Sequence, residues 1–160
     1  MQVSGAAAAV CPTSNLFLGS GFFDFAAAAA ADMRYGLASD VGGGTSFCPF
    51  HTMLAAYYVG REGQTKPGLS LSPQHLWWLH TLGAARALDL DQAPGRAGVG
   101  NLAVGCEADF VVLDAQATPL LARRTARAGS LDEWLFALIV LGDDRLLVRT
   151  VAAALPNQAL

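Results

Sequence analysis

The sequence predicts an α/β fold with a parallel sheet over residues 1–92, followed by a second part with further β-strands over residues 93–160. Up to about residue 92, short apolar runs alternate with segments of helical spacing, the order expected of strand–helix–strand units. Residues 92–105 are rich in Gly and Pro and indicate a segment that crosses between two substructures. Two β-prone runs and a helix are predicted after it.

The first part opens with two predicted strands that a helix separates. Residues 6–10 are a short apolar run, predicted as a buried strand, and the polar residues 11–15 are predicted as a loop. Residues 22–32 are dense in Ala, a strong helix former, and predict a helix. Residues 35–39 predict the second strand, with Asp40 at its carboxyl end and a glycine-rich loop after it.

Two helices are predicted to complete the first part. Aromatic and leucine side chains recur at helical spacing within residues 49–60. Ser72 and Pro73 predict the start of the next helix, because a hydroxyl caps well and proline suits the first helical position. That helix is expected to run to about Leu88, and residues 63–71 are predicted to be a linker.

The second part is predicted to contribute two strands, at residues 108–113 and 146–151. Between them Ser130 and Glu133 have the spacing of a capping box at the head of a C-terminal helix, residues 131–141.

The composition is unusually apolar. Hydrophobic residues make up 53% of the chain and charged residues 14%, with a mean hydropathy of +0.38, whereas about a quarter of an ordinary soluble domain is charged. A membrane segment is not expected, because the longest apolar runs, residues 25–31 and 135–141, fall far short of the roughly 18 residues that a spanning helix needs. The apolar excess therefore indicates a piece of a larger body, buried against other parts.

The net charge and the cysteines restrict the kinds of partner, metal site and cellular compartment to expect. The net charge of -3 gives no electrostatic reason to expect a nucleic-acid partner. The cysteines (Cys11, Cys48 and Cys106) are odd in number and form no C-x-x-C pair, so we expect neither a disulfide framework nor a structural zinc site. No basic residue precedes Arg34, as a secretory signal would require. We therefore expect a protein of the reducing cytoplasm.

The most informative motif is SDVGGGTS at residues 39–46. Asp40 lies where a buried strand gives way to three consecutive glycines, and catalytic side chains of parallel α/β folds collect at such strand ends. A carboxylate there can ligate zinc or transfer protons. Alternatively, Asp40 caps a turn through the amides of its own loop, the role that the residue pattern alone favours somewhat.

The histidines form no metal site by spacing. His75 and His80 are five apart on a predicted helix, about 140° around its axis, and so point to different faces. His51 stands alone near the start of another helix. We expect all three to be structural or surface residues.

Several motifs, in order, resemble bacterial guanine deaminases of the amidohydrolase superfamily, from about Ser4 to about Thr150. Residues 11–21 (CPTSNLFLGSG) are similar to the loop after the seventh barrel strand, and residues 39–47 are similar to the eighth-strand motif. The further matching segments are residues 71–73, 81–88, 107–114, 118–121 and 141–145. The resemblance implies the C-terminal part of a (β/α)8 TIM-type metal-dependent hydrolase barrel, with strands of a small accessory β domain.

The resemblance also implies a reaction, a metal ion and a role for Asp40. Such enzymes hydrolyse guanine to xanthine and ammonia in purine catabolism with one zinc ion, and their full-length forms pair as homodimers. Asp40 would be the eighth-strand carboxylate, which contacts the zinc and holds or deprotonates the attacking water. The histidine ligands and the proton-shuttling glutamate of the family would precede this chain, so we expect the isolated chain to be inactive.

Two alternatives stay open. One is another amidohydrolase that acts on a different nitrogen heterocycle. The other is a non-catalytic truncated remnant, which predicts no stoichiometric zinc and a tendency to aggregate.

Overall fold

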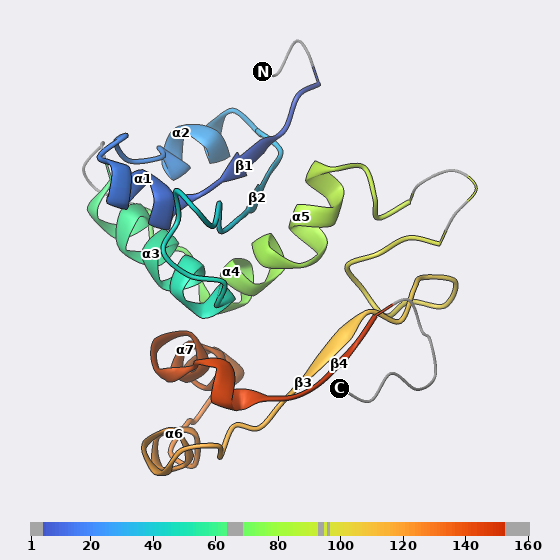
Figure 1. The fold of residues 1–160 in the computed structure, drawn as a ribbon. Helices are drawn as coiled ribbons and strands as arrows, with labels where there is room; N and C mark the ends of the chain where they lie inside the picture. Colours follow the sequence, from blue (N-terminus) through green and yellow to red (C-terminus); the bar gives the residue numbers. More distant parts are fainter. Residues whose placement is uncertain (1–4, 64–68, 93–94, 96, 153–160) are drawn as a thin grey trace.

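The computed structural model describes residues 5–63, 69–92, 95 and 97–152. Outside that description lie residues 64–68 of the predicted linker and residues 1–4, 93–94, 96 and 153–160 of the two predicted parts. The described elements are, in order, β1 (Ala8–Val10), α1 (Pro12–Leu18), α2 (Phe25–Ala30), β2 (Tyr35–Leu37), α3 (Pro49–Glu62), α4 (Pro73–His80), α5 (Leu82–Ala87), β3 (Phe110–Leu113), α6 (Pro119–Thr125), α7 (Leu131–Leu141), the 3-10 helix η2 (Asp144–Leu146) and β4 (Leu147–Val151) (Figure 1).

A parallel strand pair anchors the first part, as the sequence predicts. β1 pairs with β2 in the register Ala8↔Tyr35 to Val10↔Leu37, and the intervening chain crosses over through α1 and α2. α5 covers this pair at very short range: a Cβ built on Gly36 would lie 2.6 Å from the Ala84 Cα. The mixed α/β character of the chain is therefore confirmed, and both strands end on the same edge of the sheet.

The predicted loop at residues 11–15 is wrong, because the chain forms helix α1 there. Pro12 occupies the first helical position, where its missing N–H costs nothing, and Gly19 ends the helix at φ 69° with its N–H bonded to the Asn15 carbonyl. Thr13 and Ser14 are buried despite their polarity. Residue polarity alone therefore indicates a loop where proline and glycine delimit a short helix.

The helix expected from Pro73 to about Leu88 is in fact two helices. Thr81 has φ -125° and ψ -102°, which interrupts the helical path between α4 and α5. The Thr81 hydroxyl donates to the Trp77 carbonyl at 2.9 Å, and Gly83 lies so close to the Trp78 ring that a Cβ would approach it to 2.7 Å. The bend turns α5 onto the sheet.

The second part forms the expected strands and one helix that the sequence pattern did not predict. β3 and β4 pair antiparallel, from Phe110↔Val151 to Leu113↔Leu147. The Ser130 hydroxyl caps α7 by accepting from the Glu133 N–H at 3.2 Å. The unpredicted helix, α6, has the same kind of start, because the Thr118 hydroxyl accepts from the Leu121 N–H.

A single core cluster contains side chains from both sides of residue 92. Its deepest members are Phe25, Met53, Leu76, Leu79, Leu121, Leu138, Ile139 and Leu146. α7 packs against α3 and α4, which connects the second part to the helices that follow β2. None of the helices in the described part of the chain is long and apolar enough to cross a membrane.

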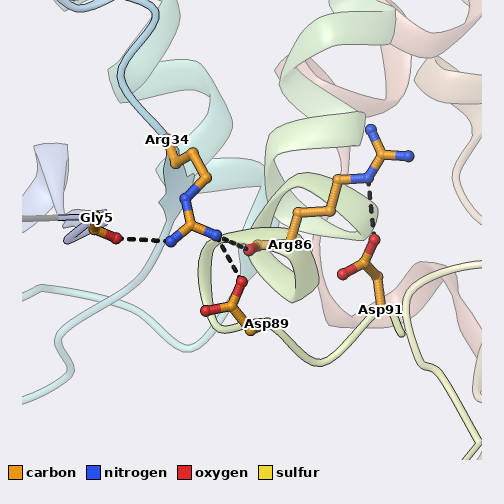
Figure 2. Close-up of polar contacts among 5 residues, drawn as sticks. All are labelled: Gly5, Arg34, Arg86, Asp89 and Asp91. Atoms are coloured by element: carbon orange, nitrogen blue, oxygen red, sulfur yellow. Dashed lines mark hydrogen bonds and ion pairs between the residues drawn. The ribbon is translucent and has the colours of Figure 1, made fainter. Parts of the chain in front are cut away.

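Opposite the carboxyl ends of the strands, an arginine joins three segments (Figure 2). Arg34 precedes β2 and donates to the Gly5 carbonyl at 2.7 Å, to the Asp89 carboxylate at 2.6 Å and to the Arg86 carbonyl at 3.4 Å. Arg86 in turn contacts Asp91 at 3.2 Å. These interactions hold the end of α5 against the start of the strand pair.

Candidate active site

The candidate site lies where β1 and β2 end on the same edge of the sheet. The chain passes from β1 into α1 through Cys11, and from β2 into the glycine-rich loop through Asp40. Parallel α/β folds place ligands at this edge, because the loops that leave the strands form the pocket there. The two segments singled out in the sequence therefore meet in space.

Asp40 is held by a buried serine. The Ser14 hydroxyl donates to Asp40 Oδ2 at 2.8 Å, across 26 residues of sequence. Ser14 is only 3% exposed, whereas Asp40 is exposed. One oxygen of an exposed carboxylate thus accepts a hydrogen bond from a buried hydroxyl of α1.

The backbone around Asp40 is tightly turned. Asp40 has φ 48° and Gly42 has φ 116°, and the Gly44 N–H donates to the Asp40 carbonyl. Among the described residues, a loop amide donates a hydrogen bond to the backbone carbonyl of Asp40 and not to its carboxylate. The described hydrogen bonds therefore do not give the Asp40 side chain the turn-capping role considered above.

Gly43 covers the serine–carboxylate hydrogen bond. A Cβ built on Gly43 would lie 2.9 Å from Asp40 Oδ2, 3.0 Å from Ser14 Oγ and 3.3 Å from Leu18 Cδ1. The two oxygens cannot both keep their positions beside a larger side chain. A larger side chain at Gly43 would therefore displace the end of at least one of these side chains.

Cys11 lies near the same carboxylate but is not an activated nucleophile. Burial raises the pKa of its thiol, and the negative charge of Asp40 raises it further. The thiol approaches the Ala9 carbonyl at 3.6 Å. Because nucleophilic cysteines need a depressed pKa, Cys11 stays a neutral thiol at pH 7.

The three histidines lie in different surroundings. His75 stacks on Trp78, with ring centroids 5.6 Å apart, and burial lowers the pKa of His80. His51 is exposed. Within residues 5–63, 69–92, 95 and 97–152, no three His, Cys, Asp or Glu side chains come together as a metal site. The described residues therefore bring fewer than three candidate metal ligands together at any one place.

Ser14 is the site residue that the sequence does not reveal. Its neighbours have the polar pattern of a loop, and a serine without a nearby base carries no chemical signal of its own. Only the hydrogen bond to Asp40 distinguishes it.

Comparison with known proteins identifies the family. The amidohydrolase family matches residues 3–145. The chain belongs to the amidohydrolase family. Members of this family are generally metal-dependent, which agrees with a carboxylate at the carboxyl end of a parallel strand.

The relatives of this amidohydrolase are guanine deaminases. It is 42% identical over 142 residues to guanine deaminase of Escherichia coli (strain K12), covering 89% of this chain and 30% of the relative. It is 40% identical over 132 residues to the probable guanine deaminase of Deinococcus radiodurans, covering 82% of this chain and 29% of the relative.

Solved structures agree with the sequence comparison. The structure of E. coli guanine deaminase superimposes with a TM-score of 0.86 at 39% identity, over 95% of this chain and 34% of that one. Guanine deaminase from Bradyrhizobium japonicum gives 0.80 at 33% identity, over 95% and 37%. The chain therefore spans about a third of the length of the proteins it matches.

Proposed function

We propose that this chain is part of a zinc-dependent guanine deaminase, which hydrolyses guanine to xanthine and ammonia in purine catabolism. The observation that carries the proposal is the 42% identity to a guanine deaminase across 89% of the chain, with Asp40 at the carboxyl end of β2. In this proposal β1 and β2 are neighbouring strands of a (β/α)8 barrel, and β3 and β4 belong to an accessory β domain. The full-length protein would act in the cytoplasm as a homodimer.

Asp40 suits a zinc ligand in its chemistry and its exposure. Carboxylate oxygens are usual ligands of catalytic zinc. Ser14 occupies Oδ2, and Oδ1 accepts no hydrogen bond from the described residues, which leaves it to bind a cation. Because a catalytic zinc ion usually has three protein ligands, the remaining ligands would come from outside the described residues.

The role proposed for Asp40 in the reaction is to handle a proton. Zinc, when bound, supplies the Lewis acidity that brings the pKa of a water molecule towards about 7. Asp40 would orient the attacking water and accept its proton as the oxygen approaches the amino-bearing carbon of guanine. That proton then leaves with the amino group as ammonia, so that guanine and water are converted to xanthine and ammonia.

The test is a chimera in which residues 3–145 replace the matching segment of the E. coli enzyme. We expect the purified, zinc-loaded chimera to release ammonia from guanine, and Asp40→Asn to lower kcat roughly 100-fold or more. Asp32→Asn is the matched control, since Asp32 is also exposed and has φ 47°. The 160-residue chain alone should be inactive.

Two results would contradict the proposal. A folded, zinc-loaded chimera that deaminates cytosine or adenine, or dechlorinates a chlorotriazine, in preference to guanine would assign the segment to another amidohydrolase. Full activity of the Asp40→Asn chimera would remove Asp40 from the reaction.

A further inference from the structure

We propose that Ser14 is a positioning residue for Asp40: its hydroxyl fixes one carboxylate oxygen so that the other is presented to the metal and the attacking water. This inference rests on the proposed function, because it assigns Ser14 a role at the site that Asp40 would serve. It is carried by the 2.8 Å hydrogen bond between Ser14 Oγ and Asp40 Oδ2.

The donor in this hydrogen bond is better fixed than the acceptor. Ser14 is 3% exposed on helix α1, which begins at the buried Pro12 and packs against α3. A serine hydroxyl has a single proton, and here it is given to a carboxylate, the kind of charge-assisted hydrogen bond that is shorter and stronger than a neutral one. The hydroxyl therefore acts as a fixed point on which an exposed carboxylate is oriented.

The backbone of Asp40 cannot supply that orientation by itself. Its φ of 48° and the bond from the Gly44 N–H to its carbonyl set the direction of the Cα–Cβ bond. On an exposed residue, rotation about the Cα–Cβ bond can still occupy several staggered positions, and rotation of the carboxylate about the Cβ–Cγ bond is broader still. The hydrogen bond from Ser14 selects one of them.

Gly43 borders the same two oxygens and leaves them space. A Cβ there would approach Asp40 Oδ2 to 2.9 Å and Ser14 Oγ to 3.0 Å, closer than side-chain atoms normally come. A Gly43→Ala substitution would therefore separate the two oxygens without removing either polar group. It should have the same consequences as loss of the Ser14 hydroxyl.

The test measures zinc retention and kinetics on the same chimera. We compare the unsubstituted protein with Ser14→Ala, Ser14→Thr and Gly43→Ala, measuring the Kd for zinc by chelator competition and kcat and KM for guanine. Removing a group that orients a metal ligand typically costs about 10- to 100-fold in metal affinity or activity. For Ser14→Ala and Gly43→Ala we expect about 10-fold weaker zinc binding and about 10-fold lower kcat, with KM within about 2-fold.

The conservative variant and a double substitution separate positioning from a structural role. Ser14→Thr keeps the hydroxyl and should recover most of both losses. Ser14→Ala should have no further effect on zinc binding once Asp40 is already Asn. Unchanged zinc affinity and kcat in Ser14→Ala, or an equal loss in the Asp40→Asn background, would overturn the proposal.

Failure of the proposed function remains distinguishable from failure of this inference. A chimera that binds zinc but does not deaminate guanine contradicts the function, while the ratio of zinc Kd values between Ser14→Ala and the unsubstituted chimera still tests Ser14. If the chimera does not fold, a double-mutant cycle of Ser14→Ala and Asp40→Ala on thermal unfolding of the 160-residue chain tests the hydrogen bond, because Ala at either position removes it. Additive effects on unfolding would overturn the proposal, and a coupling between the two residues would support it.

Discussion

One methyl group added at Gly36 should disturb the packing that supports the strand before the candidate site. It lies buried in β2, four residues before Asp40, and faces the backbone of α5. A Cβ at Gly36 would lie 2.6 Å from the Ala84 Cα, 2.9 Å from its Cβ and 3.2 Å from its backbone nitrogen. Because two of these atoms belong to the helix backbone, no side-chain rotation relieves the clash.

The expected cost follows from overpacking. Forcing an extra methyl group into a close-packed core typically costs about 1–3 kcal/mol, because neighbouring elements must shift. For a chain of this size, 1 kcal/mol lowers Tm by about 2–4 °C, so Gly36→Ala should lower Tm by about 2–12 °C. Adding Ala84→Gly should not restore the loss, because the clash with the helix backbone at residue 84 remains and glycine within a helix costs about 1 kcal/mol.

The assay is thermal unfolding of the 160-residue chain followed by circular dichroism. Gly129→Ala is the matched control: a Cβ there meets only Glu133 Oε2, at an ordinary 3.8 Å. We expect its Tm to stay within about 1 °C of the unsubstituted chain, since surface changes of this kind are small. If Gly36→Ala matched Gly129→Ala, the close packing of α5 on β2 would be refuted, and with it the reasoning that this helix holds the strand before Asp40.

Two further predictions concern the surroundings of the site. Arg34→Met should destabilise the chain more than Asp89→Asn, because the arginine also donates to two backbone carbonyls. Both substitutions should cost no more than about 1 kcal/mol, since the side chains are exposed. Equal losses of Tm in the two variants would contradict this prediction. Burial lowers the pKa of His80, so the unfolded chain binds a proton more readily than the folded one below about pH 6.5. Stability contributed by neutral His80 is therefore complete above that pH and falls as the pH drops towards the folded-state pKa. The loss of Tm from about pH 7.5 to about pH 5.5 should be smaller in His80→Gln than in the unsubstituted chain, and equal losses in the two proteins would contradict this prediction.

Elements whose apolar residues and capping groups agree were predictable from the sequence. Ser72 with Pro73, and Ser130 with Glu133, begin α4 and α7 where expected, because a capping hydroxyl and the helical pattern point to the same start. α6 has the same signal at Thr118 and could have been found by it. Its short length and its exposed arginines gave no helical apolar stripe to draw attention to it.

The bend between α4 and α5 could not be predicted from the neighbouring residues in the sequence. Leu79, Leu82 and Ala84 favour a helix, so the pattern predicts one continuous helix, although Thr81 and Gly83 are weaker helix formers. The interruption depends on tertiary packing: Gly83 lies against the Trp78 ring, while α5 turns so that Ala84 meets Gly36. A glycine on each of the two touching elements is visible in sequence, but their proximity is a property of the folded chain.

Of the two residues of the candidate site, one could be found from local sequence and the other could not. Asp40 could be located because an acidic residue followed by glycines at a strand end is a pattern within a few consecutive residues. Its partner could not, because Ser14 lies 26 residues away on a helix whose polar sequence predicts a loop. In the role proposed for Ser14, burial within α1 fixes the hydroxyl, and the exposed carboxylate of Asp40 would take one orientation by accepting a hydrogen bond from it. Polar residues of short helices that begin at proline and end at glycine are therefore candidates for the hidden donors of a catalytic carboxylate wherever such a helix follows the neighbouring parallel strand.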